Sequence, residues 1–215
     1  MTQLPLTSAG SDANYLRNNP VLTSILFPAL TSAGDFDLTG NSHLSTINFN
    51  SLISVGSIQV SQSLISSASF PVLRKANDLA YIYNNSLSTI SCPVMDTLGS
   101  LQAIINSSLA SVSVPALKSA ASLVIGNTSS FTSFAAPLLN RITGQFAVSS
   151  CPNFTSLSLP VLSTVGSFGI ITNPLLTSIS LPVLTTMSGD CIVTGEYKFF
   201  YIFYKWNDKF HRVKF

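Results

Sequence analysis

The segment LPVLSTVGSFGIITNPLLTSI, residues 159–179, contains the repeating pattern that decides the fold. Its proline belongs to a series, because a Pro-x-Leu step or its equivalent recurs at nearly constant intervals along the chain. The series runs through Pro28, Asn50 as a substitute, Pro71, Pro93, Pro115, Pro137, Pro160 and Pro182. A spacing this constant indicates a stack of equivalent units.

Apolar residues keep the same phase in each unit. Eight and ten residues after the proline comes an apolar pair, and a spacing of two is the period of a β-strand. The pairs are Phe36 and Leu38, Ile58 and Val60, Leu79 and Tyr81, Leu123 and Ile125, Phe168 and Ile170, and, displaced by one residue, Phe146 and Val148. Ser, Asn, Gly and Pro bound these runs, which is typical of short strands joined by tight turns.

A unit of about 22 residues cannot bury its apolar edge alone, whereas stacked copies share one core. We therefore predict an all-β fold, a right-handed β-solenoid of about eight 22-residue coils with parallel sheets. The proline would occupy a corner where no N–H donor is needed. The alternative is a leucine-rich-repeat horseshoe with a helix or 3₁₀ turn. Segments such as 163–166 and 31–34 are too short and too rich in Ser and Gly to favour it.

The repeat divides the chain into three parts. Residues 1–26 form a partial N-terminal repeat, since Leu6–Gly10 copies Leu30–Gly34, and residues 27–190 form the repeat solenoid. Residues 191–215 are a non-repeat tail, and the last 21 residues hold 9 of the 21 aromatic and 7 of the 18 charged residues. The tail is either a cap for the open end of the solenoid or sequence that is not native to the protein.

The composition excludes several classes of protein. Charged residues make up 8% of the chain, compared with about 25% in an ordinary soluble domain. Ser and Thr, which together are far more numerous, take the polar role. Only five basic residues occur in the first 194, too few to neutralise the phosphates of a nucleic acid. We also expect no transmembrane segment, because no run of about 18 apolar residues exists.

The consensus of the unit, L-P-x-L-x-x-x-G-x-h-x-h-x-x-N-x-x-L-x-x-h with h apolar, resembles the receptor L-domain superfamily, which is related to leucine-rich repeats. Its Ser-rich form, with NPLLTSISLPVL at Asn173–Leu184, looks like fungal GPI-anchored cell-wall and cell-surface glycoproteins. The resemblance covers roughly residues 4 to 190. This chain departs from the family because it shows no signal peptide, no GPI attachment site and no paired cysteines. Truncation of the chain would explain all three departures.

The resemblance implies a location that is extracellular, at the cell surface or in the cell wall. It implies a structural glycoprotein that is not an enzyme, needs no cofactor and supports the organisation of the wall. Its partner would be a cell-wall polysaccharide or a cell-surface protein. The alternative function is that of a ligand-binding receptor-type ectodomain or adhesin fragment.

Four Asn-x-Ser/Thr sequons mark candidate glycosylation sites at Asn84, Asn106, Asn127 and Asn153. The first three lie at almost the same distance after the proline of their coil, where we expect a turn. Asparagine is also common in turns for structural reasons, since it tolerates left-handed backbone and hydrogen-bonds neighbouring peptide groups. The sequence leaves both explanations open.

Acidic residues mark a candidate ligand face. Asp35 and Asp37 alternate with the apolar Phe36 and Leu38, so we expect both carboxylates to point outward. Asp78 should lie two coils away, at about 10 Å. The face comprises Asp35, Asp37, Ser57, Gln59 and Asp78. Paired carboxylates can cleave glycans, but the pattern predicts no further acidic or basic group near these residues. We therefore expect that the acidic residues keep the sheet soluble or form a shallow binding face, and we expect no catalysis.

Two further features, the Ser/Thr pairs and the cysteines, have structural explanations. Ser and Thr pairs such as Thr132-Ser133 and Thr177-Ser178 recur between the apolar columns. We expect that these small side chains pack at a tight edge of the coil, and the alternative is that the regular hydroxyl groups bind polysaccharide or ice. Cys92, Cys151 and Cys191 fall in different columns, which predicts small apolar fillers and no disulfide framework. No metal-binding spacing is present.

Overall fold

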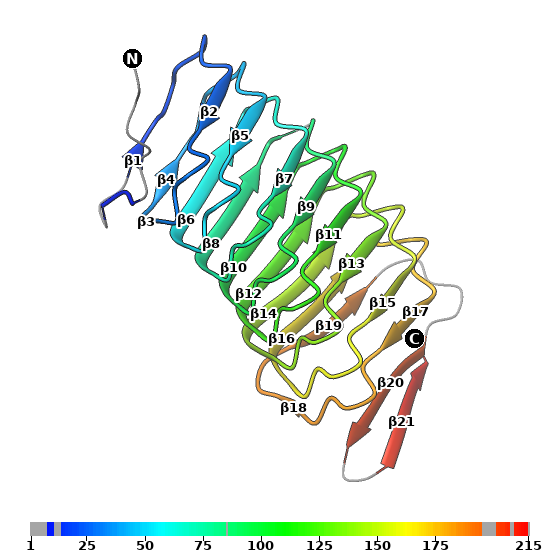
Figure 1. The fold of residues 1–215 in the computed structure, drawn as a ribbon. Helices are drawn as coiled ribbons and strands as arrows, with labels where there is room; N and C mark the ends of the chain where they lie inside the picture. Colours follow the sequence, from blue (N-terminus) through cyan, green and yellow to red (C-terminus); the bar gives the residue numbers. More distant parts are fainter. Residues whose placement is uncertain (1–7, 11–13, 85, 195–200, 207–208, 215) are drawn as a thin grey trace.

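The computed structural model of the chain is a β-solenoid of about eight coils of about 22 residues, which confirms the predicted all-β architecture. It describes residues 8–10, 14–84, 86–194, 201–206 and 209–214. The coils stack side by side along one axis, with the long strands on one face of the stack and short strands on the other (Figure 1). The described residues contain no helix, in contrast to the horseshoe alternative, and hence none that is long and apolar enough to cross a membrane.

The long strands form one eleven-stranded parallel sheet. Its order is β1-β4-β6-β8-β10-β12-β14-β16-β18, with β3 paired to β6 and β19 to β16. The bounds are β1 Asn14–Tyr15, β3 Ser32–Ala33, β4 Phe36–Asp37, β6 Ser54–Ser61, β8 Lys75–Ile82, β10 Thr97–Ile104, β12 Ser119–Gly126, β14 Arg141–Ser149, β16 Thr164–Ile171, β18 Thr186–Met187 and β19 Cys191–Thr194.

The short strands form three smaller sheets, in the orders β2-β5, β7-β9-β11-β13 and β15-β17-β20-β21. Their bounds are β2 Ser24–Leu26, β5 Thr46–Asn48, β7 Ser67–Ser69, β9 Thr89–Ser91, β11 Ser111–Ser113, β13 Ser133–Ala135, β15 Ser156–Ser158, β17 Ser178–Ser180, β20 Tyr201–Trp206 and β21 Lys209–Lys214. All pairs in these sheets are parallel except the hairpin of β20 and β21.

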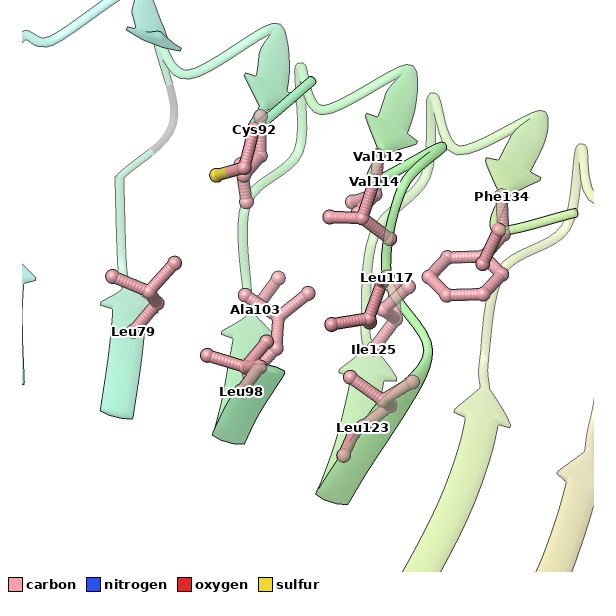
Figure 2. Packing of buried hydrophobic residues seen from close by; sticks show 14 of the residues in the cluster. Leu79, Cys92, Leu98, Ala103, Val112, Val114, Leu117, Leu123, Ile125 and Phe134 are labelled. Carbon is pink, nitrogen blue, oxygen red and sulfur yellow. The ribbon is translucent and has the colours of Figure 1, made fainter. Parts of the chain in front are cut away.

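The core lies between the two faces and consists of apolar files that run along the stack. One file is continuous in register through Phe36, Ile58, Leu79, Leu101, Leu123, Phe146 and Phe168. All seven side chains are buried. Figure 2 shows Leu98 and Leu123 on long strands and Val112 and Phe134 on short strands directed into the same interior. The apolar columns of the sequence therefore become the shared core that the repeat predicted.

The file next to it shows how neighbouring coils compensate for unequal side chains. Tyr81 is 1% exposed and lies in register between Val60 and Ala103, which are both smaller. A small cavity beside Tyr81 is also lined by Ala68. Ala68 lies on β7, and its pairing partner on the neighbouring strand β9 is the larger Ile90. The largest side chain of this file therefore lies between two smaller ones.

The proline corner is a β-turn in every coil. In the third of these turns the N–H of Leu73 donates to the carbonyl of Phe70, and Pro71 is the second residue of the turn. Equivalent hydrogen bonds join Leu30 to Phe27, Leu52 to Phe49, Met95 to Cys92, Leu117 to Val114, Leu139 to Ala136, Leu162 to Leu159 and Leu184 to Leu181. Proline suits this position because its φ is fixed near the required value and no N–H is needed there.

A second corner is built around a column of buried asparagines. The Oδ1 of Asn106 accepts from the N–H of Asn84 at 2.9 Å, and its Nδ2 donates to the carbonyls of Tyr81 at 2.7 Å and Ile104 at 3.2 Å. Three other asparagines form equivalent hydrogen bonds in their own coils: Asn41, Asn84 and Asn173. In the remaining coils the equivalent position is occupied by Ser63, Thr128 and Cys151. Each asparagine thus satisfies buried backbone groups of two successive coils.

The residue before each of these column positions adopts a left-handed backbone. Their φ values lie between 52° and 75°, and only one of the eight residues is glycine. The column is Asn18, Gly40, Gln62, Tyr83, Ile105, Asn127, Ser150 and Thr172. A left-handed residue costs about 1–2 kcal/mol unless it is glycine or asparagine, so the stack maintains several strained positions.

The two ends of the repeat follow the same register. The first coil joins the sheet through β1, and Ser8 bridges to Ser32 in the parallel direction. At the other end β19 pairs with β16, so the ladder extends four residues past position 190. Residues Ile179 and Ile202 pair between β17 and β20. Whether the segment after 190 is a cap or non-native sequence stays a prediction.

Replacing Asn106 by alanine should lower the free energy of unfolding by about 2–3 kcal/mol, because the buried N–H of Asn84 loses its acceptor and two carbonyls lose a donor. Urea unfolding measures the change. Asn153→Ala is the control, since Asn153 is exposed and loss of its surface hydrogen bond to Ser129 should change stability by less than about 1 kcal/mol. Equal effects of the two substitutions would contradict the structural role of the column.

Ile105→Gly should raise the free energy of unfolding by about 0.5–1 kcal/mol, because relief of the left-handed strain exceeds the entropic cost of glycine. The neighbouring Ile104 lies in β10, and Ile104→Gly should instead destabilise the protein. Thermal and chemical unfolding of the two variants test this difference. A loss of stability in Ile105→Gly as large as that in Ile104→Gly would show that position 105 is not strained.

Candidate ligand-binding site

The five residues of the predicted ligand face come together around one hollow on the outer side of the large sheet. Phe36 pairs with Ile58, so Asp35 lies beside Ser57, and Ser57 pairs in turn with Asp78. In the adjoining column Asp37 pairs with Gln59. The hollow has a volume of about 290 Å³ and is lined by Tyr15, Arg17, Asp35, Phe36, Asp37, Ser57, Ile58, Gln59, Asp78 and Ala80.

Asp37 lies on the outer side of the sheet, as predicted, but its side chain is buried there and only 6% exposed. Arg17, from the first coil, covers it and forms an ion pair with its Oδ2. The N–H of Thr39 donates to its Oδ1 at 3.1 Å. Burial by itself would raise the pKa of Asp37, but the hydrogen bonds from Arg17 and Thr39 outweigh burial and hold the pKa below its ordinary value of 3.8.

Tyr15 and Arg17 are site residues that the sequence analysis missed. The guanidinium carbon of Arg17 lies 4.8 Å from the ring centre of Tyr15, within the range of a cation–π interaction. The hydrogen bond to Asp37 raises the pKa of Arg17 above its ordinary value. The expectation that no basic group lies near the acidic face is therefore wrong. The signal was present in the spacing, since Tyr15 precedes its partner Asp37 by one full repeat.

Asp35 and Asp78 lie on either side of the middle coil and lean toward it. The Oδ1 of Asp35 approaches Gly56 so closely that a Cβ there would collide with it. On the other side, Oγ of Ser57 donates to Oδ2 of Asp78 at 3.3 Å. The backbones of the two acidic residues are two strand spacings apart, about 10 Å.

The arrangement offers acceptors, one amide and one aromatic ring to a ligand. Asp78, Gln59 and Tyr15 are exposed, and Tyr15 is 65% exposed. Carboxylates and amides that converge beside an aromatic ring can bind hydroxyl or amino groups. Among the described residues no group of three or more His, Cys, Asp or Glu side chains is close enough to hold a metal ion.

The four sequons divide into two buried and two exposed asparagines. Asn84 and Asn106 are completely buried in the asparagine column, and their Nδ2 atoms donate to backbone carbonyls. A glycan attached at Nδ2 is not compatible with this geometry, so these two predicted sites conflict with the fold. Asn127 and Asn153 are exposed, and Asn127 has the left-handed backbone common in turns. Glycosylation of these two stays a prediction.

The Ser and Thr pairs have a structural role. The first hydroxyl of a pair donates to a carbonyl of the preceding coil, as in Ser88 to Ser66 at 2.8 Å and Thr177 to Thr155 at 3.1 Å. Ser45 and Thr132 do the same. These hydroxyls therefore tie successive coils together at the edge of the short strands, in agreement with the structural explanation of the pairs.

The three cysteines are not alike. All are free thiols, and Cys92 and Cys151 are buried while Cys191 is exposed. Burial raises the pKa of Cys92 to about 12 and that of Cys151 to about 11, so neither thiol is a nucleophile near neutral pH. The prediction of small apolar fillers holds for these two and is wrong for Cys191.

Comparison with known proteins gives no identification. No family model matches the chain, and neither the curated proteins nor the solved structures contain a match.

Arg17→Gln should lower the stability of the protein to denaturant at pH 7, because the buried carboxylate of Asp37 loses its charged partner. The pKa of Asp37 is depressed in the folded state, so the contribution is complete above pH 3.8 and is lost as the pH falls through the folded value. Denaturant unfolding at pH 7 and pH 2.5 tests the prediction. An equal loss at both values would assign the effect to packing on Tyr15 and not to the ion pair.

Proposed function

We propose that the protein is a non-enzymatic structural glycoprotein of the cell surface or cell wall that supports the organisation of the wall. The observation that carries the proposal is the uninterrupted stack of coils with one shared core. Such a stack is stiff, because each coil is held by its neighbours through backbone ladders along its length. A stiff rod with a surface rich in hydroxyl groups and poor in charge suits a role among polysaccharides.

Two further features support the proposal. The consensus of the repeat resembles that of fungal wall glycoproteins with a GPI anchor. Sequons remain accessible at Asn127 and Asn153, on the surface of the rod. A glycan at either position would point away from the core and leave the ladders intact.

The test is to tag the protein in its own cells, fractionate wall, membrane and cytosol, and map glycans by mass spectrometry. We expect wall or surface enrichment, glycans on Asn127 or Asn153, and unmodified Asn84 and Asn106. A cytosolic protein without glycans would contradict the proposal. Glycans on Asn84 or Asn106 in folded protein would contradict the buried asparagine column.

A second candidate function is that of a ligand-binding ectodomain or adhesin. The observation that favours it is the convergence of Asp35, Asp78 and Gln59 around the hollow beside Tyr15. The ligand would be a glycan or a protein segment with hydroxyl or amino groups. This function is compatible with the first, since the hollow occupies only the N-terminal part of the stack.

A glycan array probed with the protein should give ligands whose binding falls at least tenfold in the double variant Asp35→Asn/Asp78→Asn. The matched control is Asp190→Asn. Asp190 lies beside Ser167 at the other end of the same column, far from the hollow, and its change should leave binding intact. Binding that is equally insensitive to both changes would exclude the hollow as the site.

A further inference from the structure

The basic residues of the solenoid gather at one corner. Four of the five basic residues in the first 194 lie where the long strands begin: Arg74 and Lys75 at β8, Lys118 just before β12, and Arg141 at the start of β14. In Figure 1 these strands belong to the consecutive series β8, β10, β12 and β14 of the large sheet. We call this surface the basic corner, defined as Arg74, Lys75, Lys118 and Arg141.

The ladder fixes the basic corner as two short lines parallel to the solenoid axis. Lys75 and Arg141 lie in one column, because Lys75 pairs with Thr97, Thr97 with Ser119 and Ser119 with Arg141. They are three strand spacings apart, about 14 Å. The adjoining column contains Arg74, Asp96 and Lys118. Its backbone hydrogen bonds run from Asp96 to Arg74 at 3.1 Å and from Lys118 to Asp96 at 3.0 Å.

The cations of the basic corner are available to a partner. All four side chains are exposed, and none forms an ion pair with another described residue. Asp96 is the one acidic residue in these columns between β8 and β14, and its carboxylate accepts a hydrogen bond from Thr97 at 2.9 Å. The corner therefore carries a net charge of +3, four cations less one carboxylate, on a surface that has few charges elsewhere.

The surroundings of the basic corner indicate the kind of anion. Thr97 and Ser119 lie between Lys75 and Arg141, and Asn140 follows Lys118 in the adjoining column, so neutral hydrogen-bonding groups lie beside the cations. On the preceding turn Val72 is 39% exposed and Leu138 is 51% exposed, so an aliphatic edge runs beside the cations. Hydroxyl and amide groups can bind sugar hydroxyls, and an aliphatic edge can contact the C–H face of a sugar ring.

We propose that the basic corner binds a linear acidic polysaccharide lying parallel to the solenoid axis. An extended polymer with one anionic group per sugar presents charges in a row, and the strand ladder presents cations in a row. A nucleic acid has a much denser row of charges and would need more cations than these four. The inference rests on the proposed location among wall polysaccharides and adds a partner of stated charge and shape.

The physical properties of such a contact can be stated in advance. Exposed ion pairs are individually weak, so several must form together, and affinity should rise with polymer length until the oligomer spans about 14 Å. Salt should weaken the contact because exposed charges are screened over about 10 Å at 0.1 M. Asp96 opposes the polyanion, so its neutralisation should strengthen binding.

The test uses the full chain and oligogalacturonates of two to ten sugars, with neutral malto-oligosaccharides as the control, measured by calorimetry at 50 and 300 mM NaCl. We expect binding of the acidic series only, with a plateau in affinity at intermediate length. Lys118→Gln/Arg141→Gln should weaken binding about fivefold. Lys118→Arg should retain it, and Asp96→Asn should strengthen it severalfold. Circular dichroism checks that every variant is folded.

Several outcomes would overturn the inference. The first is the absence of oligogalacturonate binding, and the second is binding that the double variant leaves unchanged. The third is tighter binding to a single-stranded oligonucleotide, or to vesicles of phosphatidylcholine and phosphatidylserine mixed two to one, than to oligogalacturonate. None of these outcomes would affect the localisation experiment, so the proposed surface role and this partner can fail separately.

Discussion

Parallel hydrogen bonding between successive coils is the constraint on which the rest of the structure depends. Each residue of a coil must lie against its equivalent one repeat earlier, so a choice at one position is repeated along the stack. Where a coil is slightly longer than its neighbours, the ladder shifts register at one point and the equivalent residues pair again beyond it. In β14 the extra residue is absorbed after Ile142, where both ladders shift register. The pairing with β16 resumes at Gln145 and that with β12 at Phe146. The apolar file therefore continues through an irregular coil.

This constraint explains why so much of the fold could be predicted from the sequence. The period of the repeat identifies which residues become neighbours, and apolar residues with a spacing of two identify the side that faces the core. The register of Asp35, Ser57 and Asp78 followed from the same counting. Proline at the turn was predictable too, because it lacks an N–H that the turn does not need.

What the sequence analysis missed depends on single-residue offsets and on an incomplete coil. Asn84 and Asn106 occupy the same buried position of their coils, whereas Asn127 lies one position earlier in its own coil and falls in the exposed left-handed column. Composition alone does not distinguish these positions, whereas the one-residue offset and the hydrogen-bonding partners do. The cover that Arg17 provides for Asp37 was missed because the first coil lacks most of the consensus, and its match to the next repeat covers only Leu6–Gly10, before Arg17.

The position of Tyr81 between the smaller Val60 and Ala103 limits how such a protein can change in length. A coil copied beside itself would place two tyrosines in adjacent positions of one file, and a coil removed would leave a void where the ring had been. The units share a pattern but are not interchangeable, because each has been adjusted to the volume of its neighbours. Gain or loss of a coil during evolution would therefore require compensating changes in the coils on both sides.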